Sequence, residues 1–183
     1  MQYSLIYLIM FFLIYGFGGF ILESAFGTII NKKRTRREGF LTNYFCPLYG
    51  LCGVVIIQLF TICEISFSNR FIALLTATIS SMATVTFFEY VVGFTLDRVF
   101  HHKMWDYSEN YFNLHSYICL EFSLIWGIMA ITLSSFIHPV IEIAVLAVPE
   151  TLAYLIVSLS ISIIVVNSSY NIRKNYNFHN IRL

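Results

Sequence analysis

Charged residues are scarce in this chain, and their scarcity argues against a soluble fold. Only 11% of the 183 residues are charged, whereas a soluble domain carries about 25%. In their place, 58% of the residues are hydrophobic and 17% are aromatic, and the mean hydropathy is +0.75. These values indicate an integral membrane protein, and the length suits one transmembrane domain over residues 1–183 rather than two domains.

Prolines, glycines, cysteines and catalytic motifs are also few. The three prolines and nine glycines form no low-complexity linker. The four cysteines form no C-x-x-C pair and lie at no zinc-finger spacing from a histidine, so we interpret them as small apolar side chains within helices. The chain has no G-x-x-x-x-G-K-[ST] loop and no G-x-S-x-G motif, so it does not bind ATP in that way by itself.

Five stretches are apolar and long enough, or nearly so, to cross a bilayer, which takes about 20 residues. They are residues 4–30, 47–63, 71–96, 116–136 and 140–166. The first stretch lacks a basic n-region and is too long for a signal peptide, so we expect it to be retained. Hydrocarbon leaves no partner for free backbone groups, so the prediction is an all-α bundle of five transmembrane helices. Asn69-Arg70 and His138-Pro139 predict tight turns after the second and fourth helices.

The basic residues predict the orientation of these helices. Ten of the eleven fall in the first loop, the third loop and the C-terminal tail, which five spans place on one side. The positive-inside rule therefore puts the N-terminus outside and the C-terminus in the cytoplasm. The run NKKRTRRE, which begins at Asn31, could also bind nucleic acid, but beside a span it is better explained as an anchor touching anionic lipid.

Four acidic residues lie within the predicted spans, away from their ends. At about 1.5 Å per residue, Glu23 lies about 13 Å from Lys32, Glu89 about 12 Å from Asp97, and Glu121 about 7 Å inside its span. These three share the cytoplasmic half of the bilayer. Glu150 lies nearer the midplane, after Pro149, where we expect a kink.

Two of these glutamates share a helix face with small residues. One face carries Gly16, Gly19, Glu23 and Gly27, and the other carries Thr86, Glu89, Gly93 and Asp97. A carboxylate facing lipid costs several kcal/mol, and small residues let helices approach closely, so both faces are expected to point inward. The glutamates could be neutral packing residues, or they could line one acidic pocket open to the cytoplasm. The similar depth of Glu23, Glu89 and Glu121 favours the pocket.

The third loop, DRVFHHKMWDYSENYFNLHS (residues 97–116), mixes aromatic and acidic side chains. It could form an aromatic belt at the level of the lipid headgroups, or a cap in which Trp105 and Asp106 close the mouth of the pocket. Its histidines and acids have no recognised ligand spacing, so we predict no metal site and no cofactor.

Three segments together resemble a known family. They are ESAFGTIINKKRTRREGFLTNYFCPLYG, FEYVVGFTLDRVFHHKMWDYSENYFNL and ICLEFSLIWG. Over roughly residues 16–127 they resemble the small multi-pass bacterial membrane proteins grouped as ABC-transporter type IV, or CmpB. The resemblance implies a multi-pass protein of the bacterial inner membrane that carries a permease label.

The resemblance also marks individual positions. They are Glu23, Gly39, Pro47, Tyr49, Gly50, Glu89, Trp105, Asp106, Tyr107, Asn113, Leu120, Ser123, Trp126 and Gly127. The chain departs from the family pattern at Ser116 and Tyr117, where the pattern has Gly-Arg, and an arginine there could pair with a glutamate. Combined with the acidic pocket, the predicted binding residues are Glu23, Glu89, Glu121, Trp105, Asp106, Tyr107, Asn113 and Tyr49.

The favoured function is a permease-like transport component for a small solute, with a cationic solute as one option. Its ATPase would be a separate chain that docks on the cytoplasmic loops. One alternative is an intramembrane enzyme acting on a lipid-like substrate, with Glu89 and Glu121 as acid and base. Another is a non-catalytic scaffold or regulator whose glutamates only pack helices. An enzyme is the less favoured outcome, and no nucleic-acid partner is expected.

Overall fold

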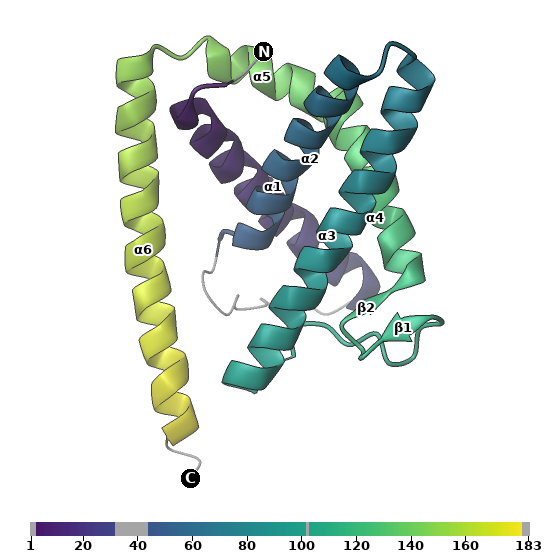
Figure 1. The fold of residues 1–183 in the computed structure, drawn as a ribbon. Helices are drawn as coiled ribbons and strands as arrows, with labels where there is room; N and C mark the ends of the chain where they lie inside the picture. Colours follow the sequence, from purple (N-terminus) through teal and green to yellow (C-terminus); the bar gives the residue numbers. More distant parts are fainter. Residues whose placement is uncertain (1–2, 32–43, 102, 181–183) are drawn as a thin grey trace. The chain divides into compact units, whose positions relative to one another are not determined.

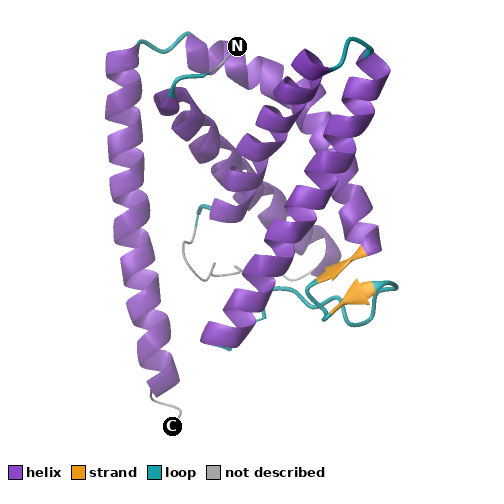
Figure 2. Ribbon diagram, viewed as in Figure 1, coloured by secondary structure: helices purple, strands orange, loops and turns teal. Residues whose placement is uncertain are grey.

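Helices make up nearly all of the secondary structure in the computed structural model, which describes residues 3–31, 44–101 and 103–180 (Figure 1, Figure 2). The elements in chain order are α1 (Leu5–Asn31), α2 (Pro47–Ser66), α3 (Arg70–Phe100), β1 (Asn113–Leu114), β2 (Ile118–Cys119), α4 (Leu120–Thr132), the π-helix η1 (Leu133–Ile137), α5 (His138–Leu146) and α6 (Glu150–Asn180). The two strands pair antiparallel as a small hairpin between α3 and α4. The predicted helical class is confirmed, with this hairpin as an addition.

Five helical segments are long and apolar enough to cross a membrane, as predicted. They are Leu5–Ala25, Pro47–Ser66, Arg70–Val99, Leu120–Leu146 and Glu150–Asn171. The fourth runs without a break through α4, η1 and α5. The orientation of the termini stays a prediction, and the basic run of the first loop, residues 32–37, lies outside the described residues.

The predicted turn between the second and third spans is confirmed. Asn69 is the N-cap of α3, and its side-chain oxygen accepts hydrogen bonds from the backbone N–H groups of Phe71 and Ile72. An asparagine in this position satisfies donors that the first helical turn otherwise leaves free. The short connection at residues 67–69 therefore joins α2 directly to α3.

The predicted turn at His138-Pro139 is wrong, because the helix continues through it. Proline has no N–H and normally disrupts a helix interior. Here the preceding turn widens into η1, and the N–H of His138 donates to the carbonyl of Leu133, five residues back. Such π-type turns absorb an irregularity inside an α-helix without ending it.

The fourth span instead ends at residues 147–149, just before α6. The N–H groups of Ala147 and Val148 close the last turn of α5, and the Pro149 carbonyl accepts from Ala153 to start α6. Proline suits a helix start, where its missing N–H costs nothing. Glu150 consequently lies in the first turn of α6, so its predicted place ten residues inside the fifth span is also wrong.

The residue contacts divide the chain into two compact units. One is Cys52–Glu142, and the other combines Gln2–Leu51 with Ile143–Leu183. In the first unit α4 packs along α3, and in the second α1 contacts α6. The core of the first unit includes one face of α3 with buried residues four apart, namely Ala73, Ala77, Ser81, Val85 and Glu89. The grouping of residues 1–183 into one transmembrane domain stays a prediction.

Candidate functional site

Glu89 is the best-defined of the predicted site residues. Its side chain is only 5% exposed on α3. The hydroxyl of Tyr107 donates to Oε1 at 2.9 Å, and the indole N–H of Trp126 donates to Oε2 at 3.0 Å. A buried carboxyl group is costly unless hydrogen bonds satisfy it, and here each oxygen has a donor. One donor comes from the loop after α3 and the other from α4, so Glu89 joins three segments.

Two aromatic side chains hold the loop against α3 and α4 beside Glu89. The ring of Tyr107 stacks on Phe122 of α4, with 4.7 Å between centroids. The indole N–H of Trp105 donates to the carbonyl of Tyr117 at 2.8 Å. Its ring lies over Gly93, where an added Cβ would come within 3.3 Å. The glycine thus gives Trp105 the room to lie against the helix.

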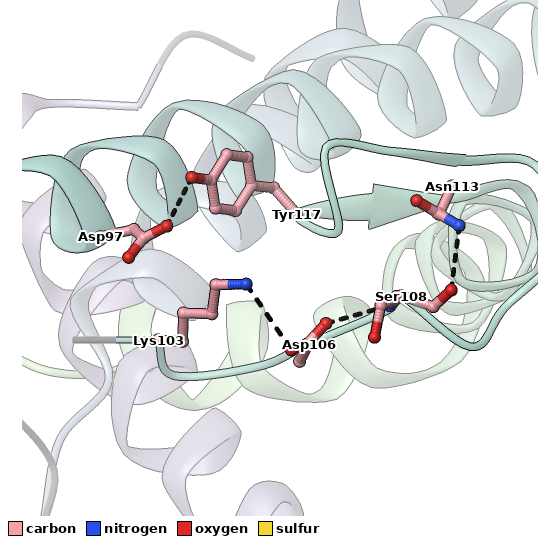
Figure 3. Close-up of polar contacts among 6 residues, drawn as sticks. All are labelled: Asp97, Lys103, Asp106, Ser108, Asn113 and Tyr117. Atoms are coloured by element: carbon pink, nitrogen blue, oxygen red, sulfur yellow. Dashed lines mark hydrogen bonds and ion pairs between the residues drawn. The ribbon is translucent and has the colours of Figure 1, made fainter. Parts of the chain in front are cut away.

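Tyr117 ties the end of the same loop to α3. Its hydroxyl donates to Oδ2 of Asp97 at 2.6 Å (Figure 3). This hydrogen bond raises the pKa of Tyr117 above its ordinary value of 10.0, because ionising the phenol would remove the proton that it donates. A phenol in this loop therefore contacts an acid of α3.

All four residues of the predicted face on the third helix now have partners. Thr86 donates to Ser123 of α4 at 3.0 Å, while Glu89, Gly93 and Asp97 contact the residues described above. The prediction that this face is a helix contact is confirmed. Its partners are the loop and α4 together.

Asp106 shapes the loop itself. The N–H of Ser108 donates to its Oδ1 at 3.0 Å, and Nζ of Lys103 lies 3.6 Å from its Oδ2 (Figure 3). These contacts hold the pKa of Asp106 below its ordinary value, with the Ser108 hydrogen bond as the main cause. Asn113 adds a further tie through its side-chain NH₂, which donates to the carbonyls of Ser108 and Asn110. The side chains of Asp106 and Asn113 therefore stabilise the conformation of the loop itself.

Glu121 lies on the first turn of α4 with a different partner. It is exposed, and its Oε2 accepts from Nδ2 of Asn110 at 2.8 Å. Glu89 and Glu121 thus have separate hydrogen-bond donors and different degrees of burial.

The pairing of α3 with α4 gives a measure of depth. Thr86 meets Ser123, and Gly127 lies against Thr78 and Met82, so the two helices run antiparallel in one register. Three residues along from the Thr86–Ser123 contact, Glu89 is level with Leu120, the first residue of α4. The eight residues between Glu89 and Asp97 predict that Glu89 lies about 12 Å inside the bilayer. The register of the two helices instead places Glu89 level with the first residue of α4, at the end of the paired part of α3 and α4.

The second unit contains the other predicted residues. A Cβ on Gly16 would overlap the ring of Phe45, and one on Gly19 would overlap Tyr49. The predicted close contact is therefore confirmed at these two glycines, whereas the surroundings of Gly27 and all of Gly39 lie outside the described residues. Glu23, four residues beyond Gly19, is half-buried. It belongs to a different unit from Glu89 and Glu121, so the convergence of the three stays a prediction.

Cys46 lies at the start of this contact, where its N–H donates to the carbonyl of Gly16 at 3.0 Å. Burial raises the pKa of its thiol to about 11, and the charge of Glu23 adds a smaller increase. All four cysteines are free thiols. In the part of the chain that the structure describes, no three His, Cys, Asp or Glu side chains group in a way that could hold a metal ion.

The spacing of the acids and the composition of the loop do not predict that Glu89 accepts from Trp126 or that Glu121 accepts from Asn110. The resemblance marks Trp126 without giving it a role. One general signal was available, because a buried tryptophan N–H usually finds an acceptor. Glu89, on the neighbouring helix of the sequence, is an obvious acceptor for it.

A family model described as "Putative ABC-transporter type IV" matches residues 10–172, which is most of the chain. Curated proteins and solved structures gave no match.

Proposed function

Because the chain belongs to this ABC-transporter type IV family, we propose that it is the membrane-embedded component of a transport system of the bacterial inner membrane. The five apolar helices support a place in the membrane. The sequence has no phosphate-binding loop of the Walker type. ATP hydrolysis would therefore come from a separate chain that docks on the loops on the cytoplasmic side.

The hydrogen bond from Tyr107 to Glu89 carries the mechanistic part of the proposal. It connects the loop after α3, a candidate docking surface for an ATPase, with a buried carboxyl group at the end of the α3–α4 pair. A docking partner that displaces this loop would remove one donor from Glu89 and expose the carboxylate to solutes. The mouth of the predicted acidic pocket would then also be lined by Glu121, Trp105, Asp106 and Asn113. Glu23 and Tyr49 stay predicted members of the same pocket.

Purification from native membranes tests the transport assignment. The full chain, tagged at its C-terminus, would be extracted in mild detergent and its partners identified by mass spectrometry. We expect a nucleotide-binding subunit to co-purify and to show ATP hydrolysis. A chain that repeatedly elutes without any nucleotide-binding protein would contradict the proposal.

One observation favours a second candidate, the scaffold or regulator. Both oxygens of Glu89 already accept hydrogen bonds from the protein, as expected of a carboxyl group that only holds a loop in place. Glu89→Gln separates the two candidates. If the variant folds but its transport system loses activity, the carboxylate takes part in transport; if activity remains, Glu89 is structural. The intramembrane-enzyme alternative stays an untested prediction.

A further inference from the structure

The tip of the loop between α3 and α4 exposes large apolar side chains. Tyr111 is 80% exposed, Phe112 is 83% exposed and Leu114 is 50% exposed. They lie next to one another around β1, whereas Trp105, Tyr107 and Tyr117 of the same loop are held against α3 or α4. The large side chains of the loop thus form two sets. The inner set packs against the helices, and the outer set, Tyr111, Phe112 and Leu114, is exposed.

The hairpin register fixes the depth of this outer set. Leu114 pairs with Ile118 and Asn113 pairs with Cys119, the residue immediately before α4. The tip therefore lies at the level of the first turn of α4, where the fourth membrane-spanning segment begins at Leu120. A chain entering the bilayer passes the headgroup layer at this level.

The tip also continues an apolar surface. Leu120, Leu124 and Ile128 follow one another at four-residue spacing on α4, and all three are exposed, as expected of a face toward lipid. Figure 1 shows the hairpin below the first turn of α4. The outer side chains of the tip therefore lie near the start of this exposed face of α4.

We propose that Tyr111, Phe112 and Leu114, which we call the hairpin tip, insert into the headgroup layer of the bilayer and anchor the loop there. Aromatic side chains favour this layer because their rings are apolar while a tyrosine hydroxyl can still reach water. The partner is the lipid surface itself. The proposal rests on the membrane-spanning helices and is independent of the transport assignment.

The anchor has a consequence for Glu89. The hairpin tip and Tyr107 belong to the same short loop, so a tip held in lipid restrains the segment that donates to Glu89. Changes in the headgroup layer would then reach the buried carboxyl group through the loop.

Fluorescence quenching tests the proposal on the full chain in lipid nanodiscs. Phe112→Trp adds a tryptophan at the tip, and the wild type provides the background from Trp105 and Trp126. We expect lipids brominated near the carbonyl end of the acyl chain to quench the added fluorescence. Lipids brominated near the methyl end should quench it less.

Two further measurements keep the outcome decisive. Tyr111→Trp repeats the test in case Phe112→Trp does not fold, and far-UV circular dichroism checks both variants. Quenching of the added tryptophan by aqueous iodide but not by brominated lipid would place the tip in water and overturn the proposal. Protection from both quenchers would mean that a second copy or another protein covers the tip, which would equally overturn it.

Discussion

Removing the Tyr107 hydroxyl should weaken the protein by an amount that the geometry allows us to estimate. The hydroxyl donates at 2.9 Å to a carboxyl group that is 5% exposed. Leaving a buried acceptor without its donor costs about 1–3 kcal/mol. We therefore expect Tyr107→Phe to lower the free energy of unfolding by about 2 kcal/mol, which is roughly a 30-fold change in the folding equilibrium.

A double-mutant cycle shows whether this loss belongs to the contact with Glu89. In Glu89→Gln the amide oxygen can still accept from Trp126, which only donates, while the amide NH₂ faces a hydroxyl that can turn to accept. Replacing Tyr107 in that background should therefore cost less, and we expect a coupling energy of about 1 kcal/mol. Tyr111→Phe is the matched control, because it removes a hydroxyl from a side chain that is 80% exposed.

Unfolding by a denaturing detergent in mixed micelles, followed by far-UV circular dichroism, measures these differences. Hydrogen exchange of the loop between α3 and α4 is the second readout, since a loosened loop should exchange faster. The reasoning fails if Tyr107→Phe behaves like Tyr111→Phe in both measurements. It also fails if the cycle shows additive losses within about 0.5 kcal/mol.

Three further predictions use the same preparations. Gly19→Ala should lower the free energy of unfolding in detergent by about 1–3 kcal/mol, because the added methyl group would overlap Tyr49. Gly18→Ala is the matched control and should be neutral or slightly stabilising, because nothing lies within 4 Å of its added methyl group. Equal effects of the two substitutions would contradict the contact with Tyr49. The raised pKa of Tyr117 means that its hydrogen bond to Asp97 stabilises the fold below about pH 10, and that this stabilisation is lost as the pH rises through the pKa of the folded state. In NMR spectra of labelled tyrosine, Asp97→Asn should move the pKa of Tyr117 back toward 10.0. A rise of the Cys46 pKa from 9.0 to about 11 leaves about 100-fold less thiolate at neutral pH. Alkylation of Cys46 should therefore be slow at neutral pH and should accelerate up to about pH 11. An alkylation rate like that of a solvent-exposed thiol would show that Cys46 is not buried.

The predicted faces of the first and third helices were accessible to sequence reasoning because helical spacing is local. Thr86, Glu89, Gly93 and Asp97 recur every three or four residues, and the cost of an acid facing lipid decides which way the face points. The partners of that face were not accessible in the same way. Tyr107 and Trp126 reach Glu89 only because the loop folds back along α3, and no spacing rule places a loop against a helix.

Two prolines show where local rules mislead. Both Pro139 and Pro149 stand in apolar surroundings, and we predicted a turn at the first and a kink at the second. In the structure the helix continues through Pro139, which η1 accommodates. It is interrupted at Pro149 instead, whose carbonyl accepts the hydrogen bond that starts α6. Pro149 followed by Glu150 was a signal for a helix start, since proline and an acidic residue both favour the first turn.

The π-helix η1 has a consequence for comparing this chain with its relatives. A π-turn holds one residue more than an α-turn, so deleting one residue between Leu133 and Ile137 would restore an α-turn and leave α5 facing the same way. His138 and Val145, which are buried on one side of α5, would keep their places. In a relative whose helix is uninterrupted here, we therefore expect an alignment gap of one residue within this segment and an unchanged pattern of polar and apolar residues on α5.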